Sequence, residues 1–189
     1  MLHLVTAHLD EPHVTAENQG NLNIEIFGNG DFVFDAGRNF EAGIISNNLV
    51  RIYDGRAMME GRYFELDEGD YEDVTVENGT QGQKRIDLIV ARYVKDSETA
   101  IETISLEIIK GTPSETPVQP SYNDGSILAG DTLVDFPMYA IHLDGITIDN
   151  IEQLFEIKDG IDGTLGEITP SQIDEWWGSS LEDGDDLEY

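Results

Sequence analysis

Residues 85–93 read Arg-Ile-Asp-Leu-Ile-Val-Ala-Arg-Tyr, the most apolar run in the middle of the chain. Isoleucine, valine and tyrosine favour a pleated, buried surface, so this run predicts a β-strand. Side chains alternate along a strand, which places one apolar set on each face: Ile86, Leu88 and Val90 on one, Ile89, Ala91 and Tyr93 on the other. Because both faces are apolar, we expect a central strand that is packed on two sides.

Three charged residues of this strand, Arg85, Asp87 and Arg92, are then expected at or near the core. An unpaired buried charge is costly, so each of the three needs a partner of opposite charge. We interpret them as structural residues that fix strand register or a subunit contact.

Short apolar runs continue on both sides of this strand at spacings of 8–12 residues, separated by Gly, Asn and Asp. This rhythm is typical of a β-sandwich or barrel, and no helix is expected before residue 149. The predicted pairs are residues 22–27 with 32–34, 49–53 with 56–59 through a tight turn at Asp54-Gly55, 85–93 with 101–110, and 138–143 with 146–148.

The sequence predicts a β-rich domain over residues 1–157, interrupted by a Pro-rich strap at residues 112–130. Asp149 or Asn150 can cap a short helix at residues 151–155. A Gly- and Asp-rich linker follows at 158–168, then a short helix at 169–178 that starts with Thr169-Pro170, and an acidic tail at 179–189. The expected fold class is mainly β, an antiparallel β-sandwich or barrel-like module with short C-terminal helices.

The chain is strongly acidic, with 39 acidic and 10 basic residues and a net charge of -29. This charge argues against nucleic acid and anionic membranes as partners, because both need clustered Lys and Arg. Two interpretations of the acidic charge remain: a surface that keeps the protein soluble, or a surface that binds a cation or a basic partner. Without cysteine there are no disulfides or thiolate metal sites. The first residues are not expected to form a signal peptide, and no apolar stretch approaches the ~20 residues of a membrane span.

Several short motifs of the chain together resemble those of a known protein family. The order Gly79-x-x-Gly82-x-x-Arg85-x-Asp87-x-Ile89-Val90-x-Arg92 follows Asp54-Gly55-Arg56 and Glu60-Gly61-Arg62. Over roughly residues 1–155 the chain resembles a module of bacteriophage and prophage tail or baseplate proteins, found at the N-terminus of tail-appendage and receptor-binding proteins.

The resemblance implies a non-enzymatic structural part of the virion tail, made in the bacterial cytoplasm. It would join the tail to a host-recognition element through contacts with other tail or baseplate proteins. It also implies a homo-oligomer, a trimer or higher.

Trp176 and Trp177 are the most prominent candidate partner-binding residues, because tryptophan is enriched at binding hot spots. The alternatives are that their helix packs back on its own sandwich, or that the rings stack on sugar. We find no nucleophile, phosphate-binding or metalloprotease motif, and expect no catalytic residues, metal or cofactor. Two alternatives remain open. One is a carbohydrate-binding β-sandwich that contacts host surface glycan, using Trp176, Trp177 and Tyr122. The other is a polysaccharide-degrading enzyme with two facing carboxylates.

Overall fold

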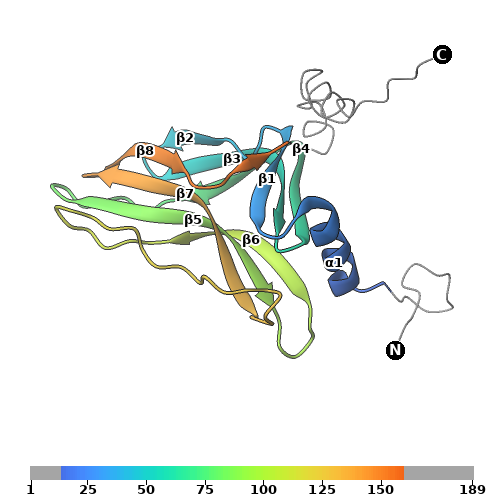
Figure 1. Cartoon of the computed structure of the whole chain (residues 1–189). Helices are drawn as coiled ribbons and strands as arrows, with labels where there is room; N and C mark the ends of the chain where they lie inside the picture. The colour runs from blue at the N-terminus through green and yellow to red at the C-terminus, as the bar shows by residue number, and fades with distance from the viewer. Residues whose placement is uncertain (1–13, 160–189) are drawn as a thin grey trace, which may run out of the picture. The chain divides into compact units, whose positions relative to one another are not determined.

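The structure is a computed structural model that describes residues 14–159, and of these residues 14–158 belong to one compact unit. In the described part the chain forms a single helix and nine strands (Figure 1). The elements are α1 (Ala16–Phe27), β1 (Asp31–Gly37), β2 (Ala42–Ser46), β3 (Leu49–Met59), β4 (Arg62–Thr75), β5 (Lys84–Lys95), β6 (Glu102–Ile109), β7 (Leu133–Asp144), β8 (Thr147–Gln153) and β9 (Ile157–Lys158).

The strands form two packed sheets. In the first sheet, β3 pairs with β4 on one edge and with β2 and then β1 on the other, and β9 extends the sheet beyond β1. The second sheet has the order β6-β5-β7-β8. All these ladders are antiparallel except that between β1 and β9. The predicted mainly β, sandwich-like fold is confirmed.

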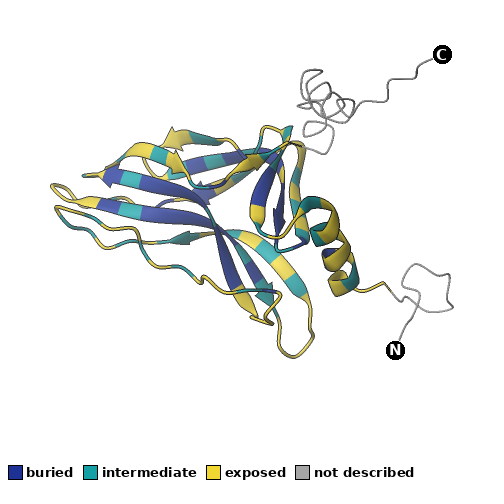
Figure 2. Ribbon diagram, viewed as in Figure 1, coloured by how far each residue is buried: buried dark blue, intermediate teal, exposed yellow. Residues whose placement is uncertain are grey.

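Strand β5 is central in its sheet and buried on both faces, as predicted (Figure 2). Ile89, Ala91 and Tyr93 contribute to the main core, together with side chains of the opposite sheet. Leu88 and Val90 form a smaller apolar cluster on the other face of the strand. The two predicted hairpins that involve this sheet, β5–β6 and β7–β8, are also present.

Residues 112–130 connect β6 to β7 and contain no helix or strand apart from an isolated bridge at Ser114. These two strands flank β5 on opposite edges, so the connection must cross the sheet. Tyr122 packs on the small cluster around Leu88 and Val90. The strap therefore covers the face of β5 that is turned away from the opposite sheet.

The helix α1 contradicts two expectations, the absence of helix before residue 149 and the hairpin between residues 22–27 and 32–34. A capping box starts it: the Thr15 side chain accepts from the Asn18 backbone N–H, and the Asn18 side chain accepts from that of Thr15. Gly61, just before β4, lets the helix approach closely, because a Cβ there would lie 2.5 Å from the Gly20 carbonyl oxygen. Tertiary contact thus stabilises a helix that the sequence alone favours only weakly.

The tight turn predicted at Asp54-Gly55 is wrong, because β3 runs without interruption through both residues. The strand is irregular here, with register shifts against both β1 and β4. Glycine is needed for a different reason: a Cβ on Gly55 would lie 2.5 Å from the backbone nitrogen of Phe40.

The short helix predicted at residues 151–155 is also wrong. Residues 147–153 form β8, which pairs with β7, and Ile148 and Ile151 pack against the main core. The open edge of β7 and this burial outweigh the capping signal at Asp149 and Asn150. The linker at 158–168, apart from its first two residues, the helix at 169–178 and the tail at 179–189 lie outside the described residues.

Candidate functional site

Arg85 and Asp87 form an ion pair inside the protein, with their side chains 2% and 0% exposed. The Arg85 Nε and Nη2 atoms donate to the two carboxylate oxygens at 2.7 and 2.8 Å. Arg85 also donates to the carbonyl oxygens of Glu77 and Asn78, and Asp87 accepts from the backbone N–H of Gly111 at 2.8 Å. The pair therefore joins the β4–β5 loop, strand β5 and the start of the strap.

Two glycines allow the backbone to close around this pair. A Cβ on Gly111 would lie 2.0 Å from the Ile86 carbonyl oxygen, and one on Gly79 would lie 2.0 Å from that of Gly145. Gly79 and Arg85 both belong to the motif that carries the family resemblance. In this structure the motif serves to fasten loops to β5.

Arg92, the third predicted charged residue, pairs with Asp135 on β7. The Arg92 Nε and Nη2 atoms donate to the Asp135 carboxylate at 2.7 and 3.1 Å. The same carboxylate accepts from the backbone and side-chain nitrogens of Asn123, at 2.9 and 2.5 Å. Arg92 thus ties β5 to β7 and, through Asp135, to the strap. The structure gives each of the three predicted residues a partner, and it places Arg92 in a separate cluster from Arg85 and Asp87.

The contacts of Asp135 predict that the free energy of unfolding falls at acid pH. Burial raises the pKa of Asp135, but hydrogen bonds from Arg92 and Asn123 outweigh it and hold the pKa below its ordinary value of 3.8. The carboxylate stabilises the fold above about pH 4, and this stabilisation is lost as the pH falls through the lower folded-state pKa. Asp135→Asn is expected to flatten that slope, measured by urea unfolding from about pH 5 to about pH 2. Asp70→Asn, at an exposed position, should keep the wild-type slope; an unchanged slope in Asp135→Asn would contradict the prediction.

All ten basic residues lie in the described part of the chain, and each contacts a carboxylate or an aromatic ring. Lys158 lies over the ring of Phe32 at 4.0 Å. The other nine lysines and arginines form ion pairs: Arg38–Glu41, Arg51–Asp73, Arg56–Glu65, Arg62–Glu102, Lys84–Asp144, Arg85–Asp87, Arg92–Asp135, Lys95–Glu102 and Lys110–Glu77. Most acidic side chains of the described residues therefore have no basic partner within the chain.

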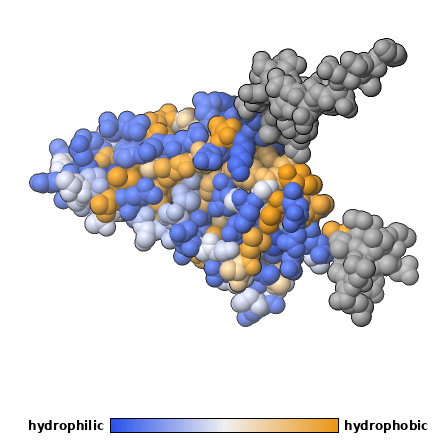
Figure 3. Space-filling view, in the orientation of Figure 1, coloured by the Kyte–Doolittle hydropathy of each residue, from blue (hydrophilic) through white to orange (hydrophobic). Residues whose placement is uncertain are grey.

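An apolar surface lies on and beside α1. Gly20 is the buried residue of this helix, whereas Leu22 and Ile26, one turn apart, are each about half exposed. At the end of the helix the rings of Phe27 and Phe34 meet edge-on at 5.3 Å, and the exposed Tyr63 ring lies 6.4 Å from that of Phe34. We call these residues, Leu22, Ile26, Phe27, Phe34 and Tyr63, the α1 face. The space-filling view shows apolar side chains gathered over α1 and the neighbouring strands (Figure 3).

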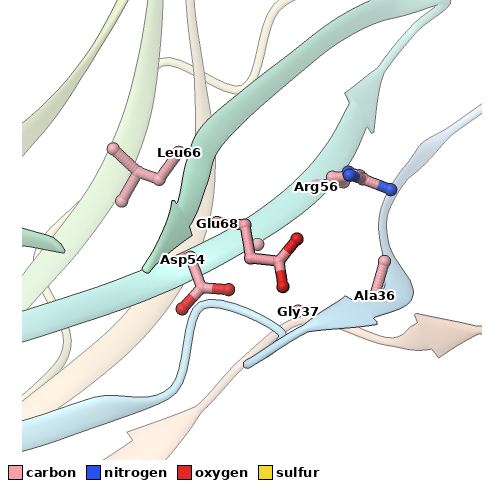
Figure 4. A pocket seen from close by; sticks show the side chains of 7 residues that line it. Ala36, Gly37, Asp54, Arg56, Leu66 and Glu68 are labelled. Carbon is pink, nitrogen blue, oxygen red and sulfur yellow. The ribbon is translucent and has the colours of Figure 1, made fainter. Parts of the chain in front are cut away.

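A polar cavity of about 150 Å³ lies beside the irregular part of β3 (Figure 4). Two carboxylates, those of Asp54 and Glu68, line it, together with the backbone of the β1 end at Gly37. Asp54 is 5% exposed, an uncommon position for an acidic residue. The cavity brings together two acids that are 14 positions apart in the sequence.

The remaining predicted site residues are placed as follows. Trp176 and Trp177 lie outside the described residues. Tyr122 packs against the apolar cluster beneath the strap, so its ring is committed to the fold. Among residues 14–159, no group of three or more His, Asp and Glu side chains is arranged to hold a metal ion. No helix in this part is long and apolar enough to cross a membrane.

No family model matches the chain, and no curated protein gives a significant match. The resemblance to tail proteins therefore rests on the motif residues alone.

Sequence reasoning found the charged residues of β5 but missed the α1 face and the cavity at Asp54. The sequence does not reveal the α1 face, because the apolar run at residues 22–27 predicts a strand. The cavity depends on strand register, which a single sequence leaves open. One signal was present, the Asp54-Gly55 pair, but it also fits a turn.

Proposed function

We propose that this protein is a non-enzymatic structural component of a phage or prophage tail or baseplate, which acts through protein–protein contacts. The observation that carries the proposal is the α1 face. Apolar side chains that are exposed together, rather than scattered singly, mark interaction surfaces. Leu22, Ile26 and Tyr63 are each about half exposed there.

The internal bracing of the fold supports the same role. Strand β5 is held by the Arg85–Asp87 pair at one end and by Arg92–Asp135 further along, and each pair also holds the strap or its start. A connector must hold the proteins that it joins in fixed positions, and a rigid frame with an adaptable surface can do this. The acidic surplus adds long-range attraction to partners of opposite charge.

The proposal predicts that the full chain forms a multimer, a trimer or higher, through the α1 face. Leu22→Glu places a charge in that contact and is expected to convert the multimer to monomer, measured by light scattering with size-exclusion chromatography. Leu128→Glu adds the same charge at another exposed position, in the strap, and should leave the multimer intact. A wild-type monomer at all concentrations would contradict self-assembly. Loss of the multimer only in Trp176→Ala or Trp177→Ala would move the contact to the predicted tryptophan pair.

The place of the chain in the tail is tested on particles. Phage particles induced from the strain that encodes this chain are expected to carry it at the tail or baseplate, detected by immunogold electron microscopy. If the chain is found in the soluble fraction and labels no particle, the proposal fails.

A further inference from the structure

Two irregularities of the first sheet lie side by side on β3, one at Asp54 and one at Gly55 and Arg56. Against β4, the paired residues step from Tyr53–Tyr71 to Gly55–Leu66, so residues 67–70 lie opposite Asp54 alone. Against β1, the pairing steps from Phe34–Arg56 to Gly37–Gly55, which leaves two further residues unpaired. Bulges of this kind turn side chains away from their regular direction and are frequent beside functional sites. Here they open the cavity of about 150 Å³ between the neighbouring strands.

Asp54 presents a carboxylate oxygen to this cavity. Its Oδ2 accepts the backbone N–H of Arg38 at 3.3 Å, whereas Oδ1 accepts no hydrogen bond from residues 14–159. Figure 4 shows the Asp54 and Glu68 carboxylates directed into the same space. At Gly37 a Cβ would lie 2.5 Å from Asp54 Oδ2, so glycine keeps the wall beside the carboxylate open. Buried polar groups in proteins normally have partners, and this oxygen calls for one from outside the described chain.

The ligand that fits is a positive charge on an aliphatic stem. We propose that this cavity binds the side chain of an arginine or lysine from a partner protein. The inference rests on the proposed role in protein–protein contact. A guanidinium group or an ammonium group can donate to both carboxylates at once. The cavity volume is several times the ~30 Å³ that one water takes up in the liquid, which leaves room for such a group.

No lysine or arginine of the chain is free for this role, because all ten lie in the described residues and are engaged with a carboxylate or an aromatic ring. Arg56 lines the cavity, but its Nε lies 3.3 Å from Glu65 Oε2 and its side chain is half exposed. In Figure 4 it points away from the two carboxylates.

The lining favours a basic side chain over a metal ion. Calcium takes six to eight oxygen ligands, and the cavity offers two carboxylates. Ala36 and Leu66 supply aliphatic wall instead. Such a wall suits the methylene stem of a lysine or arginine, whose charged end reaches the carboxylates.

The test is a titration of the ¹⁵N-labelled full chain with N-acetyl-arginine amide at low ionic strength, followed by two-dimensional NMR. Saturable shifts are expected at the backbone amides of Gly37, Gly55 and Glu68, and N-acetyl-lysine amide should move the same amides. Asp54→Asn is expected to weaken binding about tenfold, since it removes a charge-assisted contact. Glu68→Gln should weaken it in the same direction; its side chain is exposed, so this variant serves if Asp54→Asn does not fold.

The matched control is Asp70→Asn, which removes one charge from the same β4 segment without touching the cavity lining, and it should bind as the wild type does. Three results overturn the inference: no saturable shift, equal affinity in Asp54→Asn, Glu68→Gln and Asp70→Asn, or tighter binding of calcium chloride at the same amides. Self-assembly is scored separately through Leu22→Glu, so failure here and failure of the proposed function give different results.

Discussion

Replacing Arg85 with methionine is expected to lower the free energy of unfolding by about 3–5 kcal/mol. The Arg85 and Asp87 side chains are almost fully buried, and the substitution leaves the Asp87 carboxylate without its bidentate partner. It also removes the donors to the carbonyl oxygens of Glu77 and Asn78. An unpaired buried charge costs far more than the net stabilisation by the pair, so the effect is large even if the pair itself contributes little.

Urea unfolding of the full chain measures this effect, and two further variants serve as controls. Arg51→Met breaks a partly exposed pair with Asp73 and is expected to cost much less than Arg85→Met, because water screens that pair. Arg85→Met combined with Asp87→Leu removes both charges and should recover part of the loss. If Arg85→Met costs no more than Arg51→Met, the buried pair does not hold the fold as described.

Gly111→Ala is expected to destabilise the fold by about 3 kcal/mol. The added methyl group would lie 2.0 Å from the Ile86 carbonyl oxygen, which is backbone within β5 and cannot rotate away. The strap must then shift at its first residues, and the backbone hydrogen bond from Gly111 to Asp87 is weakened. We therefore expect faster amide hydrogen exchange in residues 112–130, in addition to the lower free energy of unfolding.

The matched control for this substitution is Gly82→Ala. Gly82 has φ +77° but open space around it, so alanine adds backbone strain of about 1–2 kcal/mol and no clash. Hydrogen exchange in the strap should stay at the wild-type level. A smaller loss of stability in Gly111→Ala than in Gly82→Ala would show that the close approach to Ile86 is not a constraint.

Where local pattern and tertiary environment agree, the sequence was informative. The apolar run of β5 predicted a strand buried on both faces, because alternation and burial point the same way there. It also predicted that Arg85, Asp87 and Arg92 need partners, although not which ones. Arg92 meets Asp135, 43 positions away, and such a pairing follows from the order of strands rather than from spacing.

The errors came where neighbouring elements decide. The α1 segment contains Gly20 and several asparagines, which are poor helix formers, yet its fit against Gly61 holds it helical. Residues 147–153 carry a helix-capping signal but complete a sheet whose edge is available. At Asp54-Gly55 the same dipeptide serves a hairpin turn or a bulge, and the register of both neighbouring strands selects the bulge.

The strap also sets an order of events during synthesis. Strand β5 can pair with β6 as soon as the short turn between them is made, since their paired residues are close in sequence. Its other neighbour, β7, begins at Leu133. The smaller apolar cluster of Leu88 and Val90 therefore stays uncovered until the strap and β7 have left the ribosome. A nascent chain that ends near the strap therefore exposes an apolar strand edge, the kind of surface that aggregates and that chaperones bind. Completion of this sheet is the late, non-local step that we expect to limit the folding rate.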